Sequence, residues 1–177
     1  GNDRLKSITI PSSVTSIGDG TFEGCSSLTS ITIPNSVTNI GWYAFLGCSS
    51  LTSVKVANKY CYDYFKDKVA NIAFYGANAS DDGRCLIIDG ELKIFIAKGI
   101  TEYTIPESVT SIGDVAFYGC DSLTSITIPN SVTSIEDEAF AGCDNLTSIT
   151  CLATTPPAIS DLRIGETTMI YVPKKAV

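Results

Sequence analysis

The chain has 177 residues, 44% of them hydrophobic, and its 19 acidic and 12 basic side chains give a net charge of -7. This length is sufficient for one domain with a sizeable core, the acidic balance disfavours nucleic acid as a partner, and no run of 18 apolar residues predicts membrane insertion. Histidine is absent, which excludes His-based nucleophile pairs, general bases and metal ligands; we therefore expect no enzyme activity, no metal and no cofactor.

The first predicted elements belong to a repeat of 23 residues. Pro11 and Pro34 are 23 residues apart, as are Leu28 and Leu51. The shared pattern is L-T-S-I-T-I-P-x-S-V-T-x-I-x-x-x-A-F-x-G-C-x-x. Its Ser-Ile-Thr-Ile segment alternates polar and β-branched apolar residues, which predicts a short half-buried strand that the following proline ends.

Each unit also predicts a second apolar pair and a corner. In the second copy Val37 and Ile40 are expected to point inward, and the spacing of Ala44, Phe45 and Cys48 predicts a single helical or 3₁₀ turn. A unit of this size cannot bury its own apolar side, so we expect the units to stack as a solenoid with one strand per coil in a parallel sheet.

The middle of the chain, residues 57–99, departs from the repeat. Residues 57–68 are a non-repeating, aromatic-rich insert, for which a helix is one interpretation. Residues 69–74 keep a degenerate form of the strand pattern. Residues 86–88 and 92–96 flank Asp89-Gly90, which predicts a β-hairpin with a tight turn.

The second half repeats the first with an offset of 95 residues, as Pro34 and Pro129 show. Strands are therefore predicted to start near residues 5, 28, 51, 69, 100, 123, 146 and 167. The predicted fold is one right-handed repeat solenoid over residues 1–177, mostly β, with short helical or 3₁₀ corners and about eight rungs. Its regular repeats cover 5–56 and 100–151, and a terminal degenerate repeat covers 152–177.

The repeat resembles a known family. The Leu-x-x-Ile-x-Ile-Pro core, the Ser-Val-Thr-x-Ile-Gly step and the Ala-Phe-x-Gly-Cys corner are similar to the BspA-like, treponemal-type leucine-rich repeats. The resemblance implies a leucine-rich-repeat fold and a secreted or outer-surface bacterial protein, often a lipoprotein, that acts in adhesion by binding host matrix proteins or other bacteria. It implies no catalytic residues.

The seven cysteines predict a core role. Four lie one repeat apart in two pairs, Cys25 with Cys48 and Cys120 with Cys143. Stacked coils would bring the members of each pair close but with parallel side chains, which favours a ladder of buried free thiols over strained disulfides. A disulfide between the two cysteines of the irregular middle, Cys61 and Cys85, remains an open alternative.

Two sets of residues are candidates for ligand binding. On the predicted strands the polar side chains face solvent and stack in columns, which makes a hydroxyl-rich surface containing Ser30, Thr32, Lys55, Thr104 and Thr127. The alternative is that these hydroxyls are only soluble residues compatible with a sheet.

The second set is aromatic and lies where the repeat fails. Trp42 occupies a corner position where sister repeats carry Asp or Val, and Tyr60, Tyr62 and Tyr64 lie in the insert. Residues that interrupt a repeat often form binding loops. The alternative is that these rings only pack against the flank of the solenoid.

We therefore predict a non-enzymatic adhesion module on the cell surface or outside the cell, which recognises a host matrix protein, a bacterial surface protein or a glycan through the solenoid face. A structural spacer within a larger surface protein is the alternative. Because solenoids need capped ends to remain monomeric and the first predicted strand starts near Leu5, we also expect either preceding native chain or end-to-end self-association.

Overall fold

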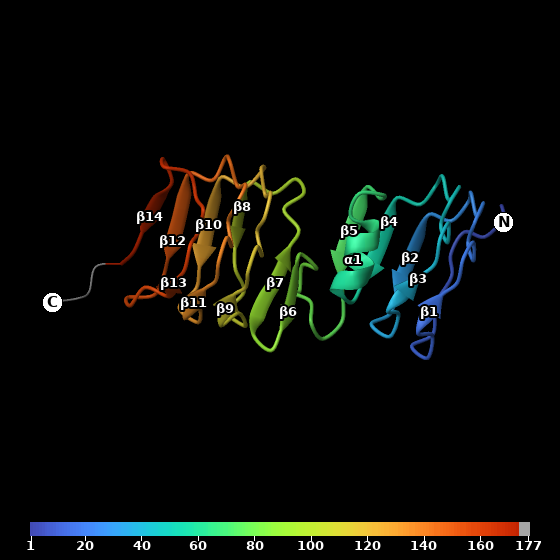
Figure 1. The fold of residues 1–177 in the computed structure, drawn as a ribbon, viewed down its shortest axis with the longest axis horizontal. Coiled ribbons are helices and arrows are strands. Elements are labelled where there is room, and N and C mark those ends of the chain that lie inside the picture. Colours follow the sequence, from blue (N-terminus) through green and yellow to red (C-terminus); the bar gives the residue numbers. More distant parts are fainter. Residues whose placement is uncertain (174–177) are drawn as a thin grey trace. The chain divides into compact units, whose positions relative to one another are not determined.

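The computed structural model describes residues 1–173, and the chain divides into two compact units, Gly1–Ala79 (unit 1) and Ser80–Val177 (unit 2). Figure 1 shows the same plan in each unit, in which short strands stack beside one another and the chain returns through turns. Each unit is described here by itself. One continuous solenoid over residues 1–177 stays a prediction, and the last part of the predicted terminal repeat, residues 174–177, lies outside the described residues.

Unit 1 contains a three-stranded sheet, a two-stranded sheet and one helix. The parallel strands β2, β4 and β5 form the larger sheet, and the parallel pair β1 and β3 forms the smaller one. The elements are β1 (Ser16–Ile17), β2 (Ser30–Ile33), β3 (Asn39–Ile40), β4 (Ser53–Val56), α1 (Lys59–Phe65) and β5 (Asn71–Phe74).

Unit 2 contains two larger sheets. The first has the order β14-β12-β10-β8 and is parallel throughout; the second has the order β13-β11-β9-β7-β6 and is parallel except for the hairpin of β6 and β7. The elements are β6 (Cys85–Ile88), β7 (Glu91–Phe95), β8 (Glu102–Thr104), β9 (Ser111–Ile112), β10 (Ser125–Ile128), β11 (Ser134–Ile135), β12 (Ser148–Cys151), β13 (Ala158–Ile159) and β14 (Met169–Tyr171).

The solenoid and its predicted strand positions are confirmed with two adjustments. Strands begin about two residues later than the repeated leucine, because the Leu28 N–H bonds back to the Cys25 carbonyl in a turn and not across the sheet. The first predicted strand is reduced to one isolated bridge between Thr9 and Thr32. The hairpin is confirmed, with Asp89 and Gly90 at positive φ in its turn.

A second strand ladder in each coil was not predicted. Val37 and Ile40 are buried as expected, but Asn39 and Ile40 also pair in parallel with Ser16 and Ile17. A two-residue strand is too short to show the alternation on which sequence-based strand prediction depends. Each regular coil therefore contributes two strands, and the expected single sheet is replaced by two.

The corners are built from consecutive turns that also bond to their neighbours. Alternate N–H groups donate to a carbonyl three residues back, as a 3₁₀ turn would require, while the N–H groups between them donate to the next coil. In unit 1 these inter-coil bonds are Gly20 to Trp42 (2.9 Å), Phe22 to Ala44 (2.8 Å) and Gly24 to Leu46 (2.7 Å); in unit 2 they include Val115 to Asp137 (3.2 Å), Phe117 to Ala139 (2.8 Å) and Gly119 to Ala141 (2.9 Å).

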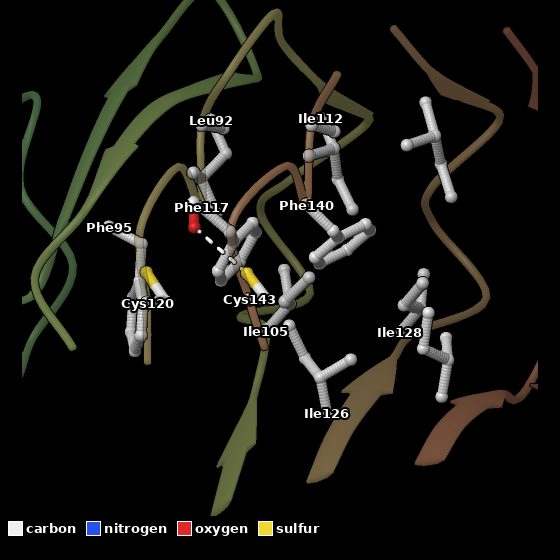
Figure 2. Packing of buried hydrophobic residues seen from close by; sticks show 14 of the residues in the cluster. Leu92, Phe95, Ile105, Ile112, Phe117, Cys120, Ile126, Ile128, Phe140 and Cys143 are labelled. Carbon is white, nitrogen blue, oxygen red and sulfur yellow. Dashed lines mark hydrogen bonds between the residues drawn. The ribbon is translucent and has the colours of Figure 1, made fainter. Parts of the chain in front are cut away.

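Equivalent side chains of successive coils stack in the core. Figure 2 shows this in unit 2, where Phe117 and Phe140 lie one above the other and Cys120 and Cys143 sit beside them. The rings of Phe95 and Phe117 are 4.9 Å apart between centroids, as are those of Phe117 and Phe140. Stacking like on like buries the apolar side that no single coil can cover.

Helix α1 takes the place of the second strand and corner in its coil. It packs against β3, β4 and β5, and Cys61 and Phe65 are its buried residues. The Asn58 side chain caps the helix by accepting from the Cys61 N–H (2.9 Å) and donates to the carbonyls of Asn35 (3.1 Å) and Val37 (3.0 Å). The helix thus satisfies backbone groups that a neighbouring coil would otherwise bond.

Candidate functional site

The two candidate sets lie on different parts of the coil. On the sheet face of unit 1, Thr32 pairs in register with Lys55, and Ser30 lies two residues before Thr32 on the same face of β2. In unit 2, Thr104 and Thr127 are register partners. The predicted columns therefore exist within each unit, but their side chains are short and no hollow of the described residues is lined by them.

The aromatic residues surround a groove in unit 1 between the corner at 42–51 and the helical segment at 64–69. A hollow of about 380 Å³ is lined by Tyr43, Phe45, Leu46, Gly47, Cys48, Ser49, Leu51, Tyr64, Phe65, Lys68 and Val69. A second hollow of about 360 Å³ is lined by Ile40, Gly41, Trp42, Tyr43, Tyr64 and Lys68. The two share Tyr43, Tyr64 and Lys68, and together they are called the aromatic groove.

Trp42 and Tyr43 present their rings to solvent at this groove. Their exposed fractions are 78% and 64%. The Trp42 N–H donates to the Asp19 carboxylate (2.7 Å), which fixes the backbone of the corner. Tyr43 has a φ of 57°, a left-handed conformation that is rare for a side chain of this kind. Val115 and Glu138 share this conformation at the same point of their coils, so it belongs to the corner and does not by itself mark a site.

The three tyrosines of the insert divide between binding surface and scaffold. Tyr64 lines both hollows. The Tyr60 hydroxyl accepts a bond from the Ile40 N–H (3.0 Å), which ties the helix to β3. The Tyr62 ring lies 5.2 Å from that of Phe74. The structure therefore brings Trp42 and Tyr64 together in the groove, while neither Tyr60 nor Tyr62 lines it.

Lys68 is the single charged residue in the lining of the groove. Its ammonium lies 4.3 Å from the centre of the Tyr64 ring and donates to the Tyr64 carbonyl. On the same segment Lys59 and Lys66 pair with Asp63, whereas Lys68 makes no ion pair within residues 1–173. Burial and the neighbouring Tyr60 hydroxyl and Cys48 thiol raise the pKa of Tyr64, and burial with the nearby Cys25 raises the pKa of Cys48, so both stay neutral near pH 7.

The groove also contains a row of backbone donors without acceptors. By the corner pattern described above, the N–H groups of Tyr43, Phe45 and Gly47 would bond to the next corner, as those of Val115, Phe117 and Gly119 do in unit 2. Helix α1 replaces that corner, and these three N–H groups have no partner among the described residues. All three residues line the larger hollow.

All seven cysteines, which lie within the described residues, are free thiols. The pairing of Cys61 with Cys85 is therefore not observed. The thiols are buried or half-buried; the Cys143 Sγ, for example, donates to the Phe117 carbonyl (3.0 Å), as Figure 2 shows. The cysteines fill the core, and Cys48 alone reaches the groove lining.

A polar cluster at the start of unit 2 has a structural explanation. The Ser80 hydroxyl donates to Asp82 (2.6 Å) and accepts from the Cys85 N–H (2.8 Å), and the Cys85 thiol lies 3.3 Å from the Tyr103 hydroxyl. Burial raises the pKa of Cys85 to about 11 and also raises that of Tyr103. Neutral, internally bonded groups of this kind fix a loop and are poor nucleophiles or bases near neutral pH.

Other kinds of site find no support in the described part of the chain. Residues 1–173 contain no group of three or more Cys, Asp or Glu side chains placed to hold a metal ion. None of their helices is long and apolar enough to cross a membrane. Unit 2 has a hollow of about 500 Å³ beside the 152–157 loop, but its lining contains neither a charged nor an aromatic residue.

Sequence reasoning missed Lys68, Leu46 and the row of backbone donors. Lys68 follows Tyr64 by four residues, the spacing at which helical side chains meet, and this signal was available. The donors carried no signal in the sequence, because they are unpaired only where a helix replaces a corner.

The stacked coils, with strands on one side and turn corners on the other, define a leucine-rich-repeat solenoid. The chain belongs to the BspA type Leucine rich repeat region family, of which six copies match residues 1–78 and 91–160. No curated protein sequence matches the chain.

Three solved structures illustrate the fold. A leucine-rich repeat protein of T. pallidum is 23% identical, with 82% of this chain and 58% of that chain covered and a TM-score of 0.29. A leucine rich cell surface protein of Faecalibacterium prausnitzii is 24% identical, with 84% and 60% covered and a TM-score of 0.31. The pneumococcal vaccine antigen PcpA is 13% identical, with 96% and 74% covered and a TM-score of 0.33. All three TM-scores are below 0.5, so the family membership rests on the repeat match.

Proposed function

We propose that this chain is a non-catalytic binding module of the bacterial cell surface, and that its binding site is the aromatic groove of unit 1. The observation that carries the proposal is the pair of exposed rings, Trp42 and Tyr43, at the edge of a hollow. Tryptophan and tyrosine dominate the binding energy of protein interfaces, and surfaces that gather such rings beside a hollow mark interaction sites.

The family supports the surface location and the absence of catalysis. One solved relative in the same fold is described as a cell surface protein, and a repeat scaffold built from stacked coils places binding surfaces and not reaction centres. The partner would be a host matrix protein, a bacterial surface protein or a glycan. The hydroxyl-rich strand faces would add weak contacts around the groove.

The test is binding to a panel of immobilised matrix proteins, bacterial surface extracts and glycans, measured for the wild type and for Trp42→Ala. We expect at least one binder whose signal falls about tenfold or more in the variant, since a central tryptophan contributes roughly 2 kcal/mol or more. Tyr118→Ala in unit 2 is the matched control, because Tyr118 is 68% exposed at a corner without a helix beside it.

Two outcomes would contradict the proposal. If no member of the panel binds the wild type, the chain behaves as a spacer. If Trp42→Ala and Tyr118→Ala weaken a binder equally, or neither does, the groove is not the site.

A further inference from the structure

We infer that the aromatic groove captures the C-terminal carboxylate of a partner polypeptide whose last residue is large and apolar. This inference rests on the proposed function, since it names the partner of the same site. It combines three independent features of the groove: donors without acceptors, one unpaired cation, and an apolar hollow of suitable size.

The donor row is the first feature. The N–H groups of Tyr43, Phe45 and Gly47 are unpartnered in the described residues, and the carbonyls of Tyr43 and Phe45 already accept bonds from Leu46 and Cys48 within the corner. This edge therefore offers donors and few acceptors. A carboxylate, which accepts and does not donate, fits such an edge better than a neutral sugar, whose hydroxyls need both kinds of partner.

Charge is the second feature. Lys68 lies on the wall shared by the two hollows, and no Asp or Glu lines either of them. An ammonium beside backbone N–H groups in a partly apolar site makes charge-assisted hydrogen bonds, which are stronger than neutral ones. An anionic group is thus attracted to the groove and meets no carboxylate there.

The hollows are the third feature. The larger one is walled by apolar side chains, including Phe45, Leu51, Phe65 and Val69, which would hold the side chain of a last residue such as Phe or Leu. The smaller hollow beside Trp42 would hold the residue before it. Backbone donors that take a C-terminal carboxylate next to a pocket for the last side chain are a known mode of peptide recognition.

The last corner of unit 2 shows why an unpaired donor is not sufficient. The N–H groups of Phe140 and Gly142 also have no partner among residues 1–173. Both residues follow Glu138, whose N–H bonds to the Asp161 carbonyl and whose carboxylate pairs with Arg163 (3.3 Å). The carboxylates of Glu138 and Asp161 would repel a second anion there, so we expect carboxylate capture in unit 1 and not at this corner.

The experiment uses Trp42, which is the single tryptophan of the chain, as a fluorescent reporter. The probe is a tetrapeptide of three alanines and a C-terminal phenylalanine, acetylated at its N-terminus, with a free carboxylate or a C-terminal amide. We expect a saturable change with the acid and about tenfold weaker binding of the amide, since charge-assisted bonds are lost. Lys68→Glu should weaken the acid at least as much, whereas its matched control Lys66→Glu should stay within about twofold.

Several results would overturn the inference. Equal binding of acid and amide, or no loss in Lys68→Glu, removes the carboxylate from the site. Equal binding of 3-phenylpropionate, which carries the ring and carboxylate without the peptide, shows a small-acid site and not a polypeptide partner. No saturable change up to about 5 mM, a dissociation constant weaker than about −3 kcal/mol of binding energy, rejects the probe class altogether. None of these results affects the proposed function if a panel member still binds through Trp42.

Discussion

Unit 1 and unit 2 are written in the same repeat, but they differ in charge and in the continuity of their corners. Unit 1 has six basic and five acidic residues, a net charge of +1, whereas unit 2 has six basic and fourteen acidic residues, a net charge of −8. In unit 2 the corner at 115–119 bonds fully to the next one, while in unit 1 helix α1 interrupts the same ladder. The comparison teaches that in this fold a groove appears where a coil is replaced and not where it is repeated.

The largest expected effect concerns the ring stack that both units share. Phe117 is fully buried between two neighbouring rings, and we expect Phe117→Ala to lower the free energy of unfolding by about 3–5 kcal/mol because it leaves a cavity. Phe45 is half-buried beside the groove, so Phe45→Ala should cost about half as much. Chemical denaturation measures both, and equal losses would show that the groove side of unit 1 is packed as closely as unit 2.

A second comparison is set by alkaline pH. Burial raises the pKa of Cys61 in unit 1 and of Cys85 in unit 2 to about 11, from an ordinary value of 9.0. Both thiols remain protonated in the folded state while the unfolded chain ionises, so their contribution is complete below pH 9 and is lost as pH rises toward 11. We expect each to cost about 2 kcal/mol over this range.

Hydrogen exchange between pH 8 and pH 11 can follow this loss in each unit, after correction for the faster chemical exchange. Cys61→Ala should make the alkaline fall shallower in unit 1 and leave that of unit 2 unchanged, whatever its effect on stability at pH 8. An unchanged slope in both units would show that tyrosine and lysine residues, and not these thiols, control alkaline stability.

Asn58 provides a test of how the helix replaces a coil. Asn58→Ala removes the N-cap of α1 and two bonds to strand-side carbonyls, and we expect a loss of about 1–2 kcal/mol in unit 1. Asn130 occupies the matching repeat position in unit 2 and is exposed, so Asn130→Ala should change stability by less than about 0.5 kcal/mol. Comparable effects of the two substitutions would mean that Asn58 does not hold the helix.

The smallest effects are expected at the left-handed corner residues. Val115→Gly should raise the free energy of unfolding by up to about 1 kcal/mol, because the relief of a left-handed β-branched residue exceeds the entropy cost of glycine. Tyr43→Gly should be similarly neutral or stabilising while it removes a ring from the groove. Thermal melts together with the binding assays separate the two roles, and a destabilised Tyr43→Gly would assign that ring to packing.

Much of the fold could be predicted from the sequence because the repeat states the same packing problem several times. The Ile31 and Ile33 positions, the proline that follows them and the Phe45 stack were all indicated by spacing alone. The paired two-residue strands could not be predicted, since Asn39–Ile40 is too short to show a period. The buried cysteines were expected, whereas the carbonyl acceptors of their thiols depend on coil register.

The candidate site was predicted only in part. Trp42 and Tyr64 were singled out because they break the repeat, and the structure places both at the groove. Tyr60 proved to be a hydrogen-bond partner of β3, a role that depends on where the helix docks. The unpaired donors are a property of a missing neighbour, which no local residue pattern encodes.

The strand ladder of unit 1 tolerates a change of coil length. β2 and β4 pair with an offset of 23 residues, whereas β4 and β5 pair in full register with an offset of only 18, although α1 lies between them. Insertions and deletions can therefore collect on the corner side without disturbing the sheet. For a protein that meets changing partners, this separates the part of each coil that must be inherited intact from the part that is open to variation.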